Sequence, residues 1–296
     1  MMIITKNLSK NYRGTKIPAL DKLNLEVKEG EIFGFIGPNG AGKTTTIRLL
    51  LDLIHPTSGS AKVLNFNIAD NSVSIRKNIG FLPGEIYLQE NLNGKDTIAY
   101  FSAFKEKVEQ DYLNYLIKKF DLEINKKVKN YSKGNKQKLA IVLALMHKPK
   151  LLILDEPTSG LDPLNQQVFY NLITETKKWG TTTFLSTHLL NEAEKICDRV
   201  GIIKDGKLLK IEDIDDFKKK NIRDIHLEIK ENIPLSAFEI EGIKKVERTT
   251  SGYHVITVGK NGDILKHLSK YNVEDIKVTE PSLEEVFMHY YGEKDA

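Results

Sequence analysis

The sequence predicts an α/β domain built on a mostly parallel sheet, followed by a small α+β unit. In the first two thirds of the 296 residues, short apolar runs typical of buried strands alternate with stretches of helical period. One of these strand-to-helix steps passes through a glycine-rich turn. Around residues 212–224 the character changes to a charged stretch, and three further strand-like segments follow it.

The α/β part opens with elements that can be placed from their residues. A turn at Gly30-Glu31 leads into an apolar strand at 32–36, and the stretch 43–53 has the period of a helix. Further along, the run 151–154 is apolar throughout. This is the pattern expected of a parallel strand that is buried on both faces.

The same part closes with a strand, a helix and a hairpin. The run 182–185 is similar to 151–154, and a helix is expected over 189–197. Strands at 200–203 and 207–209 flank Asp205-Gly206, a pair typical of a two-residue hairpin turn.

We expect the domain boundary after residue 217, so that 1–217 and 218–296 form separate domains. This boundary is suggested by a charged stretch, which contains Asp215, Asp216 and three lysines at 218–220. Beyond it we expect strands at 225–229, 253–258 and 273–278, with a helix at 263–270.

Near the C-terminus, Pro281 suits the first turn of a closing helix. Apolar side chains then recur with the spacing of one helical face, at Leu283, Val286, Phe287 and Tyr290. This pattern by itself assigns no function to the second domain.

Composition excludes several classes of protein. The longest uninterrupted apolar run, 139–146, is much shorter than the about 20 residues of a membrane helix, so we expect no bilayer-spanning segment. The N-terminus lacks the apolar core of a signal peptide. The single cysteine, Cys197, excludes internal disulfides and cysteine-based zinc sites, and it fits a reducing, cytoplasmic setting. A net charge of +4 is too mild to indicate nucleic-acid binding.

The glycine-rich turn has the composition of a phosphate-binding loop. Residues 37–44 read GPNGAGKT, which matches G-x-x-x-x-G-K-[ST] between a strand and a helix. Glycines let backbone N–H groups converge on phosphate oxygens, and the helix N-terminus adds a partial positive charge. The Lys43 amine can reach the β- and γ-phosphates, and the Thr44 hydroxyl can ligate Mg²⁺. The nucleotide-binding residues expected here are Gly37, Pro38, Asn39, Gly40, Ala41, Gly42, Lys43, Thr44 and Thr45.

Two acidic residues follow the apolar strand 151–154. Ligand sites of open α/β sheets lie at the carboxyl ends of strands, so Asp155 and Glu156 should face the same crevice as the phosphate loop. Asp155 suits the shell of Mg²⁺, and Glu156 suits a general base that polarises a water for attack on the γ-phosphate.

These two motifs and three further segments resemble the ATP-binding subunits of ATP-binding cassette (ABC) transporters, and all five occur in that family's order. Residues 131–138, YSKGNKQK, are similar to the family signature, usually LSGGQ. Residues 152–163, LILDEPTSGLDP, join the acidic strand to a D-loop. Ser186-Thr187-His188 resembles the switch histidine, and Tyr12 stands where the family has an aromatic residue that stacks on adenine. The resemblance covers about residues 2–215.

The resemblance implies a P-loop NTPase core of the ABC type, with a helical subdomain at about 86–150 and an antiparallel β subdomain. It also implies ATP and Mg²⁺ as cofactors, and catalysis of ATP hydrolysis by Lys43, Glu156 and His188. Two subunits would pair head to tail, as a homodimer rather than a heterodimer. Ser132 and Gly134 of one subunit would then meet the γ-phosphate held by the other, at another helix N-terminus.

The sequence departs from the family pattern in two places. The signature has Lys133 for a glycine and Asn135 for a glutamine, as in some drug- and antibiotic-type export subunits. The Q-loop glutamine, which normally touches Mg²⁺, is replaced by Gly84. Either the next residue, Glu85, takes over this contact with the metal, or water fills the place.

Two other segments are similar to parts of export-type subunits. Residues 86–112 are rich in aromatic and aliphatic side chains, mostly suited to packing inside a helical subdomain. Tyr87 and Leu88 among them are candidates for a groove that receives a partner's coupling helix. The C-terminal segment PSLEEVFMHYYGE, residues 281–293, resembles the tail of such subunits.

The favoured function is the ATPase subunit of a membrane exporter, bound to a separately encoded transmembrane permease at the cytoplasmic face of the membrane. The alternatives are an ABC-type ATPase without a membrane partner, whether regulatory or associated with ribosomes or DNA, an importer subunit, and an inactive cassette. Importers tend to keep the plain LSGGQ and the Q-loop glutamine, and the intact catalytic residues argue against inactivity. The chain holds one cassette and lacks a long heptad insertion, so no nucleic-acid partner is expected.

Overall fold

The computed structural model describes residues 1–219, 222–259 and 262–279. The chain divides into two compact units, Met1–Glu212 and Asp213–Ala296. The division falls slightly before the boundary expected after residue 217. The predicted closing helix and the segment 281–293 lie outside the described residues.

The larger sheet of the first unit has the strand order β10-β9-β3-β8-β7-β6. Its strands are β3 (Ile32–Ile36), β6 (Ile79–Leu82), β7 (Leu151–Asp155), β8 (Thr182–Thr187), β9 (Arg199–Lys204) and β10 (Lys207–Asp213). β3 pairs in parallel with β8 and β9, and β7 pairs in parallel with β6 and β8. Every residue of β3, β7 and β8 is buried, which confirms the parallel sheet expected from their sequences.

β9 and β10 form the predicted hairpin. Asp205 and Gly206 have positive φ angles of 49° and 74°, the backbone of a two-residue type I′ turn. The N–H of Gly206 donates to the carbonyl of Ala41 at 3.0 Å, so the hairpin turn supports the phosphate loop.

A smaller antiparallel sheet has the order β2-β1-β4-β5. Its strands are β1 (Ile3–Lys10), β2 (Leu20–Val27), β4 (Ser58–Val63) and β5 (Phe66–Asn67). In β2 the buried positions alternate with exposed ones from Leu23 to Val27, so one face of this sheet is turned to the core.

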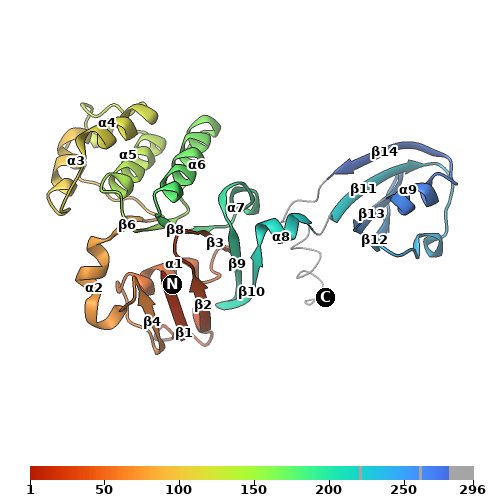
Figure 1. Ribbon diagram of the computed structural model, residues 1–296, viewed down its shortest axis with the longest axis horizontal. Helices are drawn as coiled ribbons and strands as arrows, with labels where there is room; N and C mark the ends of the chain where they lie inside the picture. Colours follow the sequence, from red (N-terminus) through yellow and green to blue (C-terminus); the bar gives the residue numbers. More distant parts are fainter. Residues whose placement is uncertain (220–221, 260–261, 280–296) are drawn as a thin grey trace. The chain divides into compact units, whose positions relative to one another are not determined.

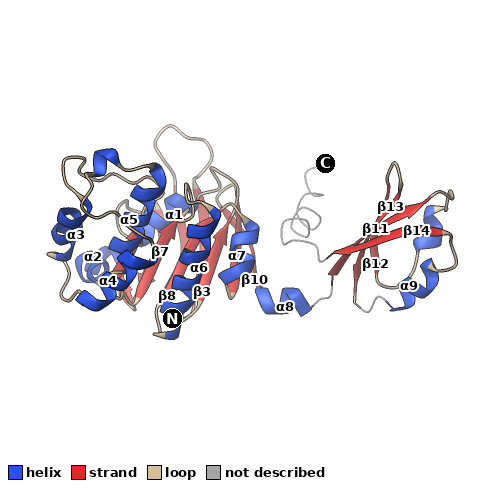
Figure 2. Cartoon of the chain, turned by 90° about the horizontal axis from the view of Figure 1, so that it is seen from above, coloured by secondary structure: helices blue, strands red, loops and turns tan. Residues whose placement is uncertain are grey.

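Helix α1 (Lys43–Leu50) lies between the two sheets, where it contacts β4 and β7 (Figure 1). Its buried side chains join residues of both sheets in one apolar core. Helices α6 (Pro163–Lys178) and α7 (Leu190–Ile196) contact β8 and β3. Figure 2 shows them, with α5, along the other face of the larger sheet.

The remaining helices of the first unit are α2 (Ile68–Lys77), α3 (Gly94–Ser102), α4 (Gln110–Lys119) and α5 (Lys133–Leu145). The last three gather in one helical group, where α5 contacts α3, α4 and β6 (Figure 1). No helix among the described residues combines the length and the apolar character needed to cross a membrane.

The second unit holds an antiparallel sheet of order β12-β13-β11-β14. Its described elements are α8 (Ile214–Lys219), β11 (Ile222–Ile229), β12 (Ile243–Arg248), β13 (Gly252–Val258), α9 (Gly262–Leu268) and β14 (Val273–Thr279). One face carries an apolar core that includes Ile225, Leu227, Tyr253 and Val255. The sequence pattern missed α8 and β12, both of which are rich in charged residues.

Candidate functional site

The phosphate loop connects the carboxyl end of β3 to α1, and its glycines are required by the space around it. A Cβ on Gly37 would lie 2.2 Å from the carbonyl oxygen of Ile203. Gly42 precedes α1 with φ 105°, and a Cβ there would lie 2.5 Å from the carbonyl oxygen of Ala19. Side chains at either position would push the loop away from the strands that hold it.

The amine of Lys43 lies over this loop. The residue is 6% exposed, and its Nζ donates to the carbonyl oxygens of Gly37 at 2.7 Å and Pro38 at 3.2 Å. Lys43 Nζ also lies 3.4 Å from Glu156 Oε1. A cavity of about 190 Å³ opens here, lined by Ala19, Pro38, Asn39, Gly40, Gly42, Lys43, Thr44, Thr45 and Glu156. An anion in this cavity would meet the lysine amine and the N-terminus of α1.

Asp155 joins the phosphate loop to the carboxyl end of β7. The Thr44 hydroxyl donates to its Oδ2 at 2.9 Å, and the Ser186 hydroxyl donates to its Oδ1. Asp155 and Ser186 are direct partners in the parallel register of β7 and β8. Ser186 therefore orients the carboxylate. No role of this kind was assigned to Ser186 from the sequence.

A magnesium ion fits the oxygen donors of Thr44 and Asp155. Mg²⁺ prefers oxygen ligands at about 2.0–2.1 Å in octahedral geometry, so adjacent ligand oxygens stand about 2.9 Å apart. The Thr44 hydroxyl oxygen and Asp155 Oδ2 have this separation.

Glu156 follows β7 in an unusual backbone conformation. Its φ is 49°, a left-handed value that is costly for a glutamate. This turn places Glu156 Oε2 2.7 Å from His188 Nδ1. Glu156 Oε1 is buried and has no hydrogen-bond partner among the residues that the structure describes. Its contact is the ion pair with Lys43 Nζ at 3.4 Å, so Oε1 can accept a proton from water once the lysine moves away.

Glu192, on the first turn of α7, is a buried carboxyl that the sequence analysis missed. It is 1% exposed, and burial raises its pKa. The charge of Glu156 adds to the rise in pKa, whereas the hydroxyls of Thr187 and Thr158 oppose it. The sequence signal for Glu192 was its position four residues after His188, because this spacing places it on the helix that follows the switch histidine.

The position of the Q-loop glutamine lies beside the magnesium ligand. A Cβ on Gly84 would stand 3.3 Å from Asp155 Oδ2. The carboxylate of the next residue, Glu85, instead accepts a hydrogen bond from the Tyr87 hydroxyl at 2.8 Å. The Glu85 carboxylate is therefore hydrogen-bonded to Tyr87 in the structure, and a contact between Glu85 and the metal stays a prediction.

The signature residues lie at the start of α5. The Ser132 side chain caps this helix by accepting from the N–H of Asn135 at 3.2 Å. A Cβ on Gly134 would lie 2.9 Å from the carbonyl oxygen of Gly160, so the signature packs tightly on the D-loop. No hydrogen bond or ion pair within the described part of the chain joins Ser132 or Gly134 to its own phosphate loop.

Tyr12 lies in the loop between β1 and β2, where its ring is 38% exposed. Lys10 Nζ stands over this ring at 5.4 Å from its centroid. Tyr12 does not line the cavity at the phosphate loop. The stacking of Tyr12 on adenine stays a prediction.

Comparisons with known proteins agree with these features. A family model described as "ABC transporter" matches residues 20–159, and one described as "ATP-binding protein DrrA1-3-like, C-terminal domain" matches residues 210–291. The chain is 34% identical to the bacitracin transport ATP-binding protein BcrA of Bacillus licheniformis, over 98% of this chain and 97% of that protein. It is 36% identical to the probable multidrug ABC transporter ATP-binding protein YbhF of Escherichia coli (strain K12), over 75% of this chain and 39% of that protein.

Solved structures show the same likeness. One, described as the ATP binding subunit of an ABC transporter, superposes with a TM-score of 0.69 at 32% identity, over 74% of this chain and 92% of the other. Another is a dimeric post-hydrolysis state of the ATP-binding cassette MJ0796 bound to ADP and Pi. It has a TM-score of 0.64 at 27% identity, over 72% of this chain and 99% of the other.

Proposed function

Because this chain belongs to the ABC transporter ATP-binding proteins and is an ATPase of that family, we propose that it powers a drug- or antibiotic-type exporter through a separate transmembrane permease. The observation that carries the proposal is the meeting of Lys43, Asp155, Glu156 and His188 at one edge of the parallel sheet. These side chains supply phosphate binding, metal binding and a base in the arrangement that phosphoryl transfer to water needs.

Each residue has a role that follows from its contacts. Lys43 turns from the loop carbonyls to the phosphates of ATP, which releases its contact with Glu156 Oε1. That oxygen then accepts the proton of the attacking water, while His188 holds Oε2 in place at 2.7 Å. The carboxylate thus becomes available as a base when phosphate occupies the cavity.

The proposed metal is Mg²⁺, held by Thr44 and Asp155. When bound, the ion neutralises the charge that develops on the phosphate oxygens. The Ser186 hydroxyl donates to Oδ1 of Asp155, which keeps the other oxygen, Oδ2, beside the Thr44 hydroxyl. In place of the missing Q-loop glutamine, water completes the shell beside Gly84.

The active unit we propose is a head-to-tail homodimer. Ser132 and Gly134 open α5, whose N-terminal N–H groups favour an anion. Their separation from the phosphate loop of the same chain suits a contact with the γ-phosphate held by a second copy. The dimeric state of the related cassette MJ0796 supports this arrangement.

The permease would dock in an apolar groove of about 350 Å³ in the first unit. The groove is lined by Leu51, Leu53, Arg76, Ile79, Phe81, Pro83, Ile86, Tyr87, Leu88, Phe101, Lys105, Ala140, Leu143, Ala144 and His147. Tyr87 at its rim is 85% exposed, although a large aromatic ring gains by burial. A short amphipathic helix of a membrane protein fits such a groove, which would hold the chain at the cytoplasmic face.

A direct test of the catalytic assignment is Glu156→Gln in the purified chain. Glutamine keeps the size of the side chain but cannot take a proton, so we expect ATP hydrolysis to fall at least 100-fold with ATP binding retained. The variant should also form an ATP-dependent dimer in size-exclusion chromatography. Normal turnover would refute the role of Glu156, and failure of the ATP-bound variant to dimerise would refute the proposed homodimer.

The proposed permease is tested by co-expression of this chain with a candidate membrane protein chosen from its neighbouring genes. We expect the permease to stimulate ATPase activity, and Leu88→Arg to keep basal activity but lose the stimulation. Leu209→Arg on β10, a substitution at a side chain 42% exposed and outside the groove, is the matched control. Equal stimulation of the Leu88→Arg variant would remove the groove from the proposal.

A further inference from the structure

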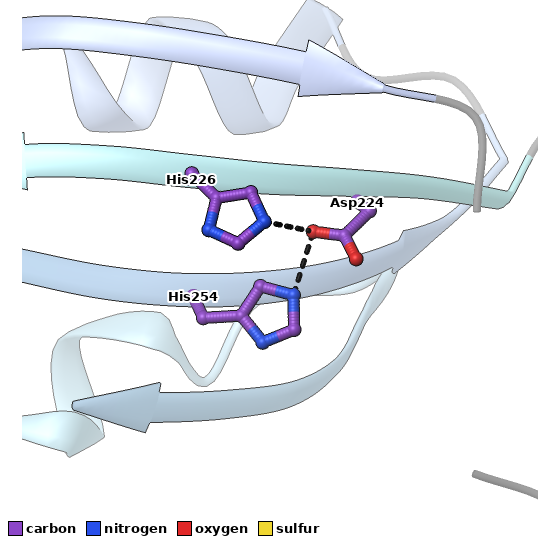
Figure 3. A group of neighbouring side chains, drawn as sticks. All are labelled: Asp224, His226 and His254. Carbon is purple, nitrogen blue, oxygen red and sulfur yellow. Dashed lines mark hydrogen bonds and ion pairs between the residues drawn. The ribbon is translucent and has the colours of Figure 1, made fainter. Parts of the chain in front are cut away.

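Two histidines and an aspartate meet on the polar face of the second unit. Asp224 and His226 alternate along β11, so both side chains leave the same face of the sheet. His254 on β13 is the direct antiparallel partner of His226. The other face of these strands carries the apolar core. Figure 3 shows both rings turned toward the carboxylate of Asp224.

The donor atoms of this cluster converge on one point. His254 Nε2 lies 2.6 Å from Asp224 Oδ1, and His226 Nε2 lies 3.2 Å from the same oxygen. The two imidazoles are stacked with centroids 4.5 Å apart. One ligand atom from each of the three residues lies within 4.8 Å of the others.

We propose that Asp224, His226 and His254 form a binding site for a divalent transition-metal ion of the zinc class. Neighbouring ligand atoms of a tetrahedral zinc site are about 3.3 Å apart, given bonds of about 2.0–2.1 Å. The His226 nitrogen already stands at this distance from the carboxylate, and the His254 nitrogen has to retreat by only about 0.7 Å.

A second carboxylate supports the assignment from the far side of His254. Glu247 on β12 is the register partner of His254, and its Oε2 lies 3.7 Å from His254 Nδ1. Lys245 binds the other oxygen of Glu247 at 2.9 Å. A metal-bound histidine usually gives its second N–H to a carboxylate, which fixes the ring and its tautomer. His254 has a carboxylate in that position.

The donor set also decides which cations suit the site. Imidazole nitrogens favour Zn²⁺, Co²⁺, Ni²⁺ and Cu²⁺, whereas Mg²⁺ and Ca²⁺ prefer sites made of oxygens. Asp224 is 4% exposed, and a buried carboxylate needs a compensating positive charge that a divalent ion supplies. Three protein ligands leave a fourth position for water.

The test is a titration of the full chain with ZnCl₂ by calorimetry, after removal of metals and in excess Mg²⁺ to occupy the oxygen site at Asp155. We expect one Zn²⁺ per chain, at least 10-fold weaker binding in His226→Gln and in His254→Gln, and 10- to 100-fold weaker binding in Glu247→Gln. Co²⁺ should give a visible absorption spectrum of four-coordinate type that the histidine variants lose.

The matched control is His55→Gln, because the His55 side chain is exposed and its ring lies beside Asp52, outside the proposed cluster. Its affinity for Zn²⁺ should equal that of the unmodified chain. The His226 side chain is 53% exposed, so His226→Gln should fold normally, which circular dichroism verifies. Absence of Zn²⁺ binding, or binding unchanged in both His226→Gln and His254→Gln, would overturn the proposal. Loss of binding in His188→Gln instead would assign the ion to the ATPase site.

Discussion

The apolar groove of the first unit is lined by a half-buried histidine, His147, whose titration should be measurable as a change in the free energy of unfolding. His147 Nε2 lies 3.2 Å from the carbonyl oxygen of Ile79, to which Lys105 Nζ also donates at 3.3 Å. Burial, with a smaller contribution from the charge of Lys105, lowers the pKa of His147 to about 4. His147 therefore stays neutral in the folded protein at pH values where an unfolded histidine is charged.

The sign and size of the effect follow from linkage. Between the unfolded pKa of about 6.5 and the folded pKa of about 4, the unfolded chain binds the extra proton, so stability falls as the pH falls through this window. Going from pH 7.5 to pH 5, this one group should remove about 2 kcal/mol of stability. The opposite sign would require a histidine whose pKa is higher in the folded protein than in the unfolded chain.

The perturbation is His147→Gln, which keeps a donor for the Ile79 carbonyl and removes the titration. Urea unfolding can be followed by the fluorescence of the single tryptophan, Trp179, whose ring packs edge-on to Tyr112 at 5.2 Å. Between pH 7.5 and pH 5, the free energy of unfolding of the unmodified chain should fall by about 2 kcal/mol more than that of the variant. His55→Gln should lose as much as the unmodified chain. An equal loss in His147→Gln and the unmodified chain would refute the reasoning.

Three shorter predictions concern the ATPase site. Gly37→Ala puts a methyl group 2.2 Å from the Ile203 carbonyl oxygen. The free energy of unfolding should therefore fall by about 1–3 kcal/mol, and the affinity for ATP should fall at least 10-fold. The control is Gly262→Ala, where an added Cβ meets nothing within 4 Å. Glu85→Ala should leave Mg²⁺-dependent ATPase activity unchanged, because Tyr87 holds that carboxylate; a loss of activity would make Glu85 the substitute ligand. Burial raises the pKa of Glu192, so the folded protein keeps this proton to a higher pH than the unfolded chain does. The unmodified chain should therefore lose stability as the pH rises above about 4.3, and Glu192→Gln should lack this contribution. The same change in unfolding temperature between pH 4.5 and pH 7.5 in both proteins would contradict this.

The parts of the site that were predictable are those written in contiguous sequence. The phosphate loop is one string between a strand and a helix, and Asp155-Glu156 directly ends an apolar strand. Each local pattern implies its own backbone geometry. The role of Ser186 could not be assigned in this way. The contact between Ser186 and Asp155 exists because β7 and β8 pair in a particular register, which no local pattern encodes.

The same reason explains what was missed in the second unit. β12 has the sequence IKKVER, whose apolar residues Ile243 and Val246 are three apart because the register shifts between Ile243 and Lys245. A shifted register breaks the alternation by which strands are predicted. The Asp224–His226–His254 cluster likewise depends on the pairing of β11 with β13, although β12 lies between these two strands in the sequence.

The charged side chains at the ATPase site are linked in a chain of contacts. Lys43 is nearly buried, and a buried ammonium without partners would be costly. The loop carbonyls and Glu156 supply those partners, and His188 in turn holds the second oxygen of Glu156. An incoming phosphate competes for the same lysine, so the contact that stabilises the resting site is also the contact that restrains the base. Under the proposed mechanism, binding of the nucleotide and release of Glu156 are one event, and the left-handed turn at Glu156 places its carboxylate beside the phosphate loop.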